Sequence, residues 1–275
     1  MKYKLVVIDV DGTLVDRHGN IAEEDKAAVN RLVKSFVKVS LCTGRVLQAC
    51  KPIIEELHLS TPHIMFDGAL IYSLTGHSTL YAKPLPPMLV KEAVDYCHVN
   101  DIYLELYSRD VFFAERENWS DDIHRKFFRV EPKFTNFDGI WEKERILKAE
   151  MVVHSIEEAR KAKEFADNFA GRLNFSIAHT PAHPEMEFLN IVNTEVSKGE
   201  ALRFLASEIG AYPTEIIAIG DGLNDISLLR EAGNAVAMGD APDEVKAVCQ
   251  YTTLDVEHHG VASAIDYFFP DLGIH

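Results

Sequence analysis

Short apolar runs alternate with helical patterns over the first 70 residues of the chain. The run Lys4–Val10 ends at acidic residues and Gly12, which is typical of a buried parallel strand that opens into a loop. The same criteria predict strands at 36–42 and 63–66 and helices at 22–37 and 46–57. This alternation predicts an α/β fold, a doubly wound and mostly parallel sheet.

A different pattern follows the proline cluster Lys83-Pro84-Leu85-Pro86-Pro87, which favours a hinge or linker. The segments 102–107 and 111–114 are too close for a crossover and predict a hairpin. Further strands are expected at 150–154, 173–178 and 187–192, with helices at 88–100 and 156–170. This middle part is therefore predicted to be an inserted α+β cap domain.

The parallel pattern returns after Asn193. Helices are expected at 197–209 and 225–232, and strands at 215–219 and 234–238. We therefore predict a catalytic core formed by residues 1–83 and 194–275, with residues 84–193 inserted as the cap.

Composition narrows the possible partners. The chain has 275 residues, of which 47% are hydrophobic, and a formal net charge of -15, so it is expected to fold around a core and to repel nucleic acid. The chain has no apolar run of about 18 residues and no signal-peptide pattern, which predicts a cytoplasmic protein without membrane contact. Its four cysteines form no CxxC pair and are expected to be buried thiols. A phosphate site in such an acidic chain needs a metal, a lysine or backbone amides as its source of positive potential.

Two aspartates end the first predicted strand. Asp9 and Asp11 are two residues apart, so both point the same way from the carboxyl end of the strand, where open α/β sheets bind ligands. Two adjacent carboxylates favour a bound cation or a shared proton. A carboxylate with an ordinary pKa of about 3.9 needs no base to act as a nucleophile. Asp9 is thus the candidate nucleophile and Asp11 the candidate acid and base.

Other candidate groups follow later strands. Gly220-Asp221-Gly222-Leu223-Asn224-Asp225 offers oxygen ligands that suit Mg²⁺ better than zinc, although an ordinary acidic turn that caps a helix is the alternative. Thr43-Gly44 offers a hydroxyl and amides to a phosphate, and Lys198 offers an ammonium. Taken alone, a threonine at a strand end or a solvated lysine would be unremarkable.

Together these segments resemble the four motifs of the haloacid dehalogenase superfamily. The motif segments are Asp9-Val10-Asp11-Gly12-Thr13-Leu14, Thr43-Gly44-Arg45, Lys198-Gly199 and the loop 220–225. The position of the insert resembles a C2 (IIB) cap. The segments Asp67-Gly68-Ala69-Leu70-Ile71-Tyr72 and Ala237-Met238-Gly239-Asp240-Ala241 resemble the Cof-type phosphatase subfamily, whose core is Rossmann-like.

The resemblance implies roles for individual residues. Asp9 would be phosphorylated, and Asp11, Thr43 and Lys198 would be the other catalytic residues. Magnesium would be bound by Asp9, Asp221 and the Asp11 carbonyl, with support from Asn224 and Asp225. The residues expected to hold phosphate or substrate are Gly12, Thr43, Gly44, Arg45, Lys198, Asn224 and Asn190.

Three positions depart from the Cof-type pattern. Asp67 and Asp240 stand where asparagine is usual, and the added negative charge is expected either to weaken phosphate binding or to disfavour a second anionic group on the substrate. Asn190 stands where a glutamate is frequent, so contacts with the leaving group are expected to differ. On the cap, Tyr107, Arg109, His183 and Asn190 are candidate specificity residues.

These features predict a magnesium-dependent phosphomonoester hydrolase that acts through an aspartyl-phosphate on a small cytosolic ester. The resemblance suggests a sugar phosphate or a phosphorylated cofactor such as FMN or pyridoxal phosphate. Two alternatives remain, a phosphotransferase such as a phosphomutase and a regulatory module that binds a phospholigand without turnover. The sequence does not indicate an oligomeric state.

Overall fold

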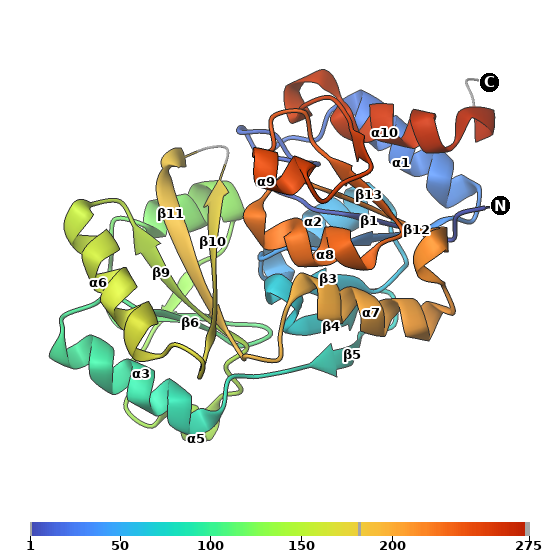
Figure 1. Ribbon diagram of the computed structural model, residues 1–275. Helices are drawn as coiled ribbons and strands as arrows, with labels where there is room; N and C mark the ends of the chain where they lie inside the picture. Colours follow the sequence, from blue (N-terminus) through green and yellow to red (C-terminus); the bar gives the residue numbers. More distant parts are fainter. Residues whose placement is uncertain (1, 181–182, 273–275) are drawn as a thin grey trace.

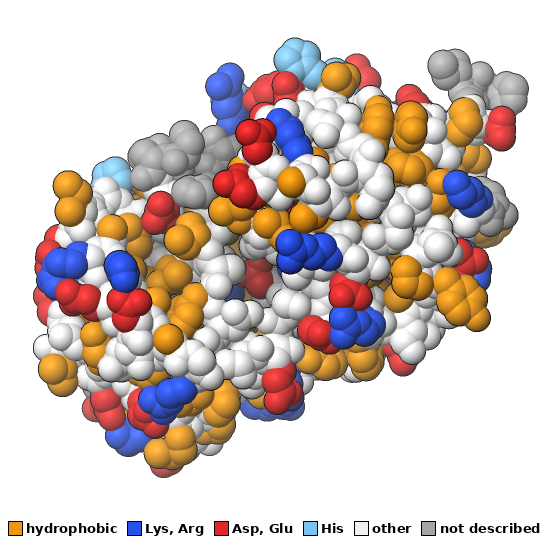
Figure 2. All heavy atoms as spheres, viewed as in Figure 1, with side chains coloured by type: hydrophobic (Ala, Val, Ile, Leu, Met, Phe, Trp, Pro, Cys, Tyr) orange, Lys and Arg blue, Asp and Glu red, His pale blue; other side chains and the backbone are white. Residues whose placement is uncertain are grey.

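The structure, a computed structural model, describes residues 2–180 and 183–272, and side chains outside 179–185. Two lobes lie side by side, and one of them contains both ends of the chain (Figure 1). On the face seen in Figure 2, lysine and arginine side chains are interspersed with acidic ones.

The lobe with the termini is built on a five-stranded parallel sheet. Its order is β14-β13-β12-β1-β2, and its strands are β1 (Leu5–Ile8), β2 (Lys38–Leu41), β12 (Ile216–Gly220), β13 (Asn234–Ala237) and β14 (Tyr251–Thr252). Ile8 is level with Leu41 on one side and with Ile219 on the other. The residues that follow these three strands therefore emerge together at one edge of the sheet.

Helices cover both faces of this sheet, which explains why its strands read as continuous apolar runs. Val6 and Ile8 face the helices α1 (Glu23–Lys34), α2 (Leu47–Glu56) and α10 (Gly260–Phe268). Leu5 and Val7 pack on the opposite face against α7 (Lys198–Ile209) and α8 (Ile226–Glu231). A short helix, α9 (Asp243–Lys246), follows β13.

A small antiparallel sheet extends this layer beyond β2. It consists of β3 (His63–Met65), β4 (Leu70–Ser73) and β5 (Ser78–Ala82), and one parallel bridge between Cys42 and Ile64 joins β3 to the end of β2. The strand predicted at 63–66 is present, but the β4–β5 hairpin was not predicted. A short helical turn, η1 (Phe66–Gly68), links β3 to β4.

The second lobe contains a six-stranded sheet in the order β10-β11-β9-β6-β7-β8. Its strands are β6 (Glu105–Tyr107), β7 (Phe112–Ala114), β8 (Pro132–Phe134), β9 (Lys148–Val153), β10 (Asn174–Thr180) and β11 (His183–Val192). Its helices are α3 (Pro87–Val99), α4 (Asp121–Ile123), α5 (Ile140–Lys143) and α6 (Ile156–Asn168), with a π-helical turn η2 (His124–Phe128). Helices α3 and α6 lie on the side away from the other lobe, so the opposite face of the sheet is turned towards it (Figure 1).

Two chain segments cross between the lobes and contact each other. Asn193 Nδ2 donates to the carbonyl of Pro84 at 3.0 Å, and Lys83 forms an ion pair with Glu195. The predicted boundaries at 83/84 and 193/194 lie at these crossings. We propose on this basis that residues 84–193 form a cap that moves relative to a core made of 1–83 and 194–275.

Candidate active site

A cavity of about 500 Å³ lies between the two lobes. Its core side is formed at the carboxyl ends of β1, β2 and β12, where Asp9, Thr43 and Asp221 are located. Its other side is the inner face of the cap sheet, which contributes Tyr107, Glu150 and other residues. The sheet edge predicted from the sequence is thus one wall of a cavity between the lobes.

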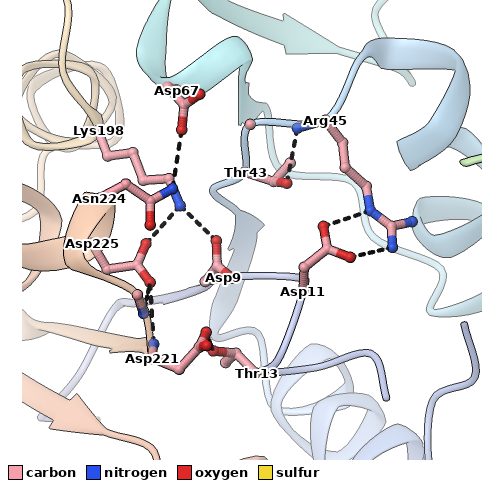
Figure 3. A network of polar contacts seen from close by, with 12 residues as sticks. Asp9, Asp11, Thr13, Thr43, Arg45, Asp67, Lys198, Asp221, Asn224 and Asp225 are labelled. Carbon is pink, nitrogen blue, oxygen red and sulfur yellow. Dashed lines mark hydrogen bonds and ion pairs between the residues drawn. The ribbon is translucent and has the colours of Figure 1, made fainter. Parts of the chain in front are cut away.

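Asp9 is buried at the centre of the core wall. It follows β1 directly, and its amide donates to the carbonyl of Ile219 at 2.9 Å. The ammonium of Lys198 donates to Asp9 Oδ1 and to Asp225 Oδ1, both at 2.6 Å (Figure 3). Lys198 itself is 2% exposed. The buried ammonium of Lys198 therefore links two carboxylates that are far apart in the sequence.

The loop after β12 holds the remaining acidic groups. Asp225 Oδ2 accepts from the amides of Asp221 and Gly222 at 3.1 and 2.9 Å, which fixes the turn. The hydroxyl of Thr13 donates to Asp221 Oδ1 at 2.7 Å. Gly12 has φ +84°, and a Cβ there would lie 2.5 Å from Asp221 Oδ2, so this position requires glycine.

These carboxylates carry more negative charge than Lys198 offsets. Burial, and then Asp225, raise the pKa of Asp9 well above its ordinary value, while Lys198 acts against the rise. Burial and Asp225 also raise the pKa of Asp221, to about 7. Burial disfavours the charged form of Lys198, but Asp225 and Asp9 outweigh that effect and raise its pKa. The cluster therefore favours a further cation or proton.

The donor set fits a divalent ion. Asp9, Asp221 and Asp225 each offer a carboxylate oxygen, and these oxygens lie within 4.8 Å of one another. Carboxylate oxygens suit hard cations such as Mg²⁺. The closeness of these three carboxylate oxygens is the geometric reason to expect a metal ion here.

Asp11 takes a different direction from Asp9. Arg45 donates to Asp11 through Nε at 2.8 Å and through Nη2 at 2.6 Å, a two-point contact (Figure 3). The guanidinium lies 5.2 Å from the ring centres of both Phe127 and Phe128 in η2 of the cap. Arg45 thus connects the carboxylate of Asp11 to the cap.

The segment after β2 lies next to this pair. Thr43 Oγ1 accepts from the amide of Arg45 at 3.1 Å, and both residues line the cavity together with Gly44. Lys148 of the cap donates to the carbonyl of Gly44 at 3.2 Å. The hydroxyl and amides predicted to hold phosphate are therefore beside Asp9 and in contact with the cap.

Comparison with known proteins bears on this arrangement. Residues 6–265 match the haloacid dehalogenase-like hydrolase family, and this range contains Asp9, Thr43 and Asp221. The chain belongs to this family. A phosphatase of Bacillus subtilis, 5-amino-6-(5-phospho-D-ribitylamino)uracil phosphatase YwtE, is 27% identical over 96% of this chain and 97% of its own.

Solved structures agree with the assignment. A haloacid dehalogenase-like hydrolase from Bacteroides thetaiotaomicron superposes with a TM-score of 0.85 at 26% identity, over 98% of this chain and 100% of its own. The subclass IIB sugar phosphatase BT4131 shares the fold, with a TM-score of 0.82 at 22% identity over 96% of this chain and 98% of its own. The predicted family, the α/β fold and the assignment to phosphatases are confirmed.

Two unusual acidic residues of this hydrolase lie close to the site. Asn224 Nδ2 donates to Asp67 Oδ1 at 3.3 Å, whereas the buried Asp67 Oδ2 has no hydrogen-bond partner. Asp240 is exposed, but its charge contributes to the raised pKa of Asp221, after burial, Asp225 and other neighbours. Both side chains therefore add negative charge near the acidic cluster of Asp9, Asp221 and Asp225.

The candidate cap residues of the hydrolase are placed differently from one another. Tyr107 and Asn190 line the cavity. Arg109 bonds to its neighbour Asp110, lies over the ring of Tyr72, and is not among the described residues that line the cavity. The side chain of His183 lies outside the described part of the chain.

Several cap residues in the cavity were not predicted. They are His124, Phe128, Lys148 and Glu150, with Glu105 directly behind them. The sequence contained a signal for this polar face. Two pairs of residues in or next to predicted strands are two positions apart, and so share a face: Glu105 with Tyr107, and Lys148 with Glu150. Polar residues on a strand face are usually solvent-exposed, however, and only the core lobe makes this face internal.

Across residues 2–180 and 183–272, no helix has both the length and the apolar character needed to cross a bilayer.

Proposed function

We propose that this hydrolase is a magnesium-dependent phosphomonoesterase in which Asp9 becomes phosphorylated. The observation that carries the proposal is the buried Asp9 carboxylate, held by Lys198 and placed within ligand distance of Asp221 and Asp225. A carboxylate nucleophile suits attack on a phosphate ester when the ammonium of Lys198 and a cation bound by the neighbouring carboxylates hold it in its ionised form.

The first half-reaction transfers the phosphoryl group to the enzyme. An Asp9 oxygen forms a bond to phosphorus as the bond from phosphorus to the ester oxygen breaks, and Asp11 gives its proton to that oxygen. Thr43, the amide of Gly44 and Lys198 hold the phosphoryl oxygens. A divalent ion bound by Asp9, Asp221 and the Asp11 carbonyl, with Asn224 and Asp225 in support, would offset the negative charge of the phosphate.

The second half-reaction restores the enzyme. Asp11 accepts a proton from a water molecule whose oxygen attacks phosphorus, the bond to Asp9 breaks, and inorganic phosphate leaves. The two-point contact from Arg45 fixes Asp11 at the cavity wall during this step. A cap that covers the site would limit the access of other water and so protect the phosphorylated Asp9 from uncontrolled hydrolysis.

The proposed substrate is a small phosphate ester of the cytoplasm, such as a sugar phosphate or a phosphorylated cofactor. A cavity of about 500 Å³ has the size of a small-molecule site. The relatives named above support the class, since one acts on a phosphoribitylamino-uracil and another is a sugar phosphatase.

Release of inorganic phosphate tests the proposal. Aryl phosphates and a panel of metabolite phosphates are incubated with Mg²⁺ or with EDTA, for the wild type, for Asp9→Asn, and for Asp167→Asn as a control on the outer surface of the cap. We expect turnover that requires Mg²⁺, is lost in Asp9→Asn and is unchanged in Asp167→Asn. Isomer interconversion without phosphate release would instead show a phosphotransferase, and tight binding without turnover would show a regulatory module.

A further inference from the structure

Several contacts from the cap meet one short core segment that follows β2. Lys148 of the cap donates to the carbonyl of Gly44 at 3.2 Å, and Gln48 donates to the carbonyl of Asp110 in the cap. Arg45 lies between these two contacts in the sequence and meets the π-helical turn η2. The same segment forms part of the cavity wall. A movement of the cap would therefore act directly on this wall.

Two aromatic rings of η2 form a corner beside the guanidinium of Arg45. Its central carbon lies 5.2 Å from the ring centres of both Phe127 and Phe128. The two rings stand at 86° to each other, with their centres 5.1 Å apart. Arg45 is only 8% exposed, and a cation–π contact of this kind becomes stronger when water is excluded from it. The cap therefore helps to hold and to desolvate the guanidinium.

The same guanidinium holds Asp11 on the core side. Nε and Nη2 of Arg45 donate to the two carboxylate oxygens of Asp11 (Figure 3). An ionised carboxylate has about four acceptor positions, so Asp11 can accept these two bonds and still accept a proton from water. Its side chain is 18% exposed and lines the cavity, where a water molecule can reach it. The arrangement suits the step in which Asp11 acts as a base.

This arrangement depends on the position of the cap. If the cap moved away from the core, water would replace Phe127 and Phe128 beside the guanidinium. An ion pair weakens when water reaches it, because the effective dielectric constant rises. Asp11 would then be held less firmly, and its carboxylate would spend less time in the orientation that the structure shows.

Resting on the proposed phosphatase function and on the proposed movement of the cap, we propose that Phe127 and Phe128 are positioning residues for the second half-reaction. The rings hold Arg45, and Arg45 holds Asp11 where it takes a proton from the water that attacks phosphorylated Asp9. The oxygen of this water forms a bond to phosphorus as the bond to Asp9 breaks, and the proton stays on Asp11 for the next leaving group. A cap in contact with the core thereby favours hydrolysis of the intermediate.

Phe127 allows a test that leaves the cavity lining intact. Phe128 lines the cavity between the lobes, whereas Phe127 is not among the described residues that line it. Phe127→Leu keeps an apolar side chain but removes the ring, and Phe127→Tyr keeps the ring. Phe134→Leu makes the first of these changes at a residue of β8 that is 43% exposed, and it serves as the control.

4-Nitrophenyl phosphate separates the two half-reactions, because its leaving group departs as an anion and needs no proton. At saturating ester and Mg²⁺, acid quenching gives the fraction of enzyme phosphorylated on Asp9, and kcat divided by this fraction gives the rate constant of hydrolysis. We expect this rate constant to fall about 5- to 30-fold in Phe127→Leu, as loss of one desolvated cation–π contact would give. The value of kcat/KM covers only the steps up to nitrophenolate release, and it should stay within about twofold of the wild type.

Further variants show whether Phe127 acts through Arg45. The hydrolysis rate constant of Phe127→Tyr should equal that of the wild type, and so should that of the control. Arg45→Met should lower the rate constant at least as much as Phe127→Leu, and the double variant should show no further fall. A general disturbance of cap packing would instead lower kcat/KM as well and would add to the effect of Arg45→Met.

The inference and the proposed function fail in different ways. If the wild type forms no phosphorylated Asp9 and releases no phosphate, the proposed function is wrong and the inference fails with it. If the wild type turns over the ester but Phe127→Leu leaves the hydrolysis rate constant unchanged, the phosphatase stands and the positioning role is wrong. The same conclusion follows if kcat/KM falls equally, if Phe134→Leu has the same effect, or if Phe127→Leu adds to Arg45→Met.

Discussion

Replacement of Lys198 by methionine should test the charge balance of the site most directly. The side chain keeps a similar length, but Asp9 and Asp225 lose the ammonium that lies 2.6 Å from each of them. Removal of one partner from a buried ion pair costs about 3–5 kcal/mol of folding free energy. Loss of a charge that stabilises a transition state costs about 100- to 1000-fold in kcat.

The stability loss should depend on pH. Lys198 counteracts the rise in the pKa of Asp9, so that pKa moves further upward in the variant. The folded variant then binds protons more tightly than the unfolded chain, and its stability falls as pH rises from acid to neutral. We therefore expect the full 3–5 kcal/mol loss near pH 8 and a clearly smaller loss near pH 5.

Urea unfolding of wild type and variant at pH 5, 6.5 and 8, in EDTA, measures this difference. Added Mg²⁺ should raise the melting temperature of the variant more than that of the wild type, because the cation replaces the missing positive charge. A loss below about 1 kcal/mol at pH 8, or an equal loss at both ends of the pH range, would refute a buried ammonium shared between two carboxylates.

Other predictions concern the metal, the Asp11 pair, a glycine and a remote carboxylate. Because the pKa of Asp221 is raised to about 7, Mg²⁺ affinity measured by calorimetry should weaken as pH falls below 7, and Asp221→Asn should remove that pH dependence. Arg45→Lys keeps the charge but loses the two-point contact, so steady-state kinetics should show kcat/KM about tenfold lower, and an unchanged value would contradict the proposed positioning of Asp11. Gly12→Ala should strongly reduce Mg²⁺-dependent turnover, since the new Cβ would meet Asp221 Oδ2, and full activity would rule out that contact. Burial raises the pKa of Asp25 from 3.8 to about 6, so the wild type loses stability as pH rises through 4–6. In urea unfolding, Asp25→Asn should therefore be up to about 3 kcal/mol more stable than the wild type at pH 8 and equally stable at pH 4. The exposed control Glu23→Gln should show no such pH-dependent gain.

The core of the site could be predicted because its residues follow buried parallel strands. Such strands are apolar on both faces, so their ends are visible in the sequence, and in a parallel sheet those ends meet at one edge. Asp9, Thr43 and Asp221 were placed together on that basis, and the structure brings them to one cavity. Their catalytic roles stay predictions.

Other features depend on contacts that a linear pattern does not encode. Arg45 and Asp11 are 34 positions apart, and no sequence pattern favours their pairing over the predicted contact of Arg45 with phosphate. The strand predicted to start at Glu150 begins at Lys148, where it pairs with Tyr107 of β6. Two charged residues so close together do not indicate a buried strand, but here both line the cavity. The β4–β5 hairpin is a further difference, because residues 67–72 resemble a motif and no strand is predicted at 78–82.

The strand order of the core sheet also determines when catalytic capacity arises during protein synthesis. Among the strands of the core sheet β1 leaves the ribosome before the others, yet its neighbour β12 begins only at Ile216. At about 5–20 residues per second, β1 waits on the order of 10–40 seconds for that neighbour, with an apolar edge exposed to chaperones and to other nascent chains. Lys198 and Asp225 belong to the same late segment, so a nascent chain with a finished cap still has no cation beside Asp9. A translational pause before β12 would thus yield an inert, aggregation-prone product, and the enzyme becomes active only once its C-terminal segment has emerged.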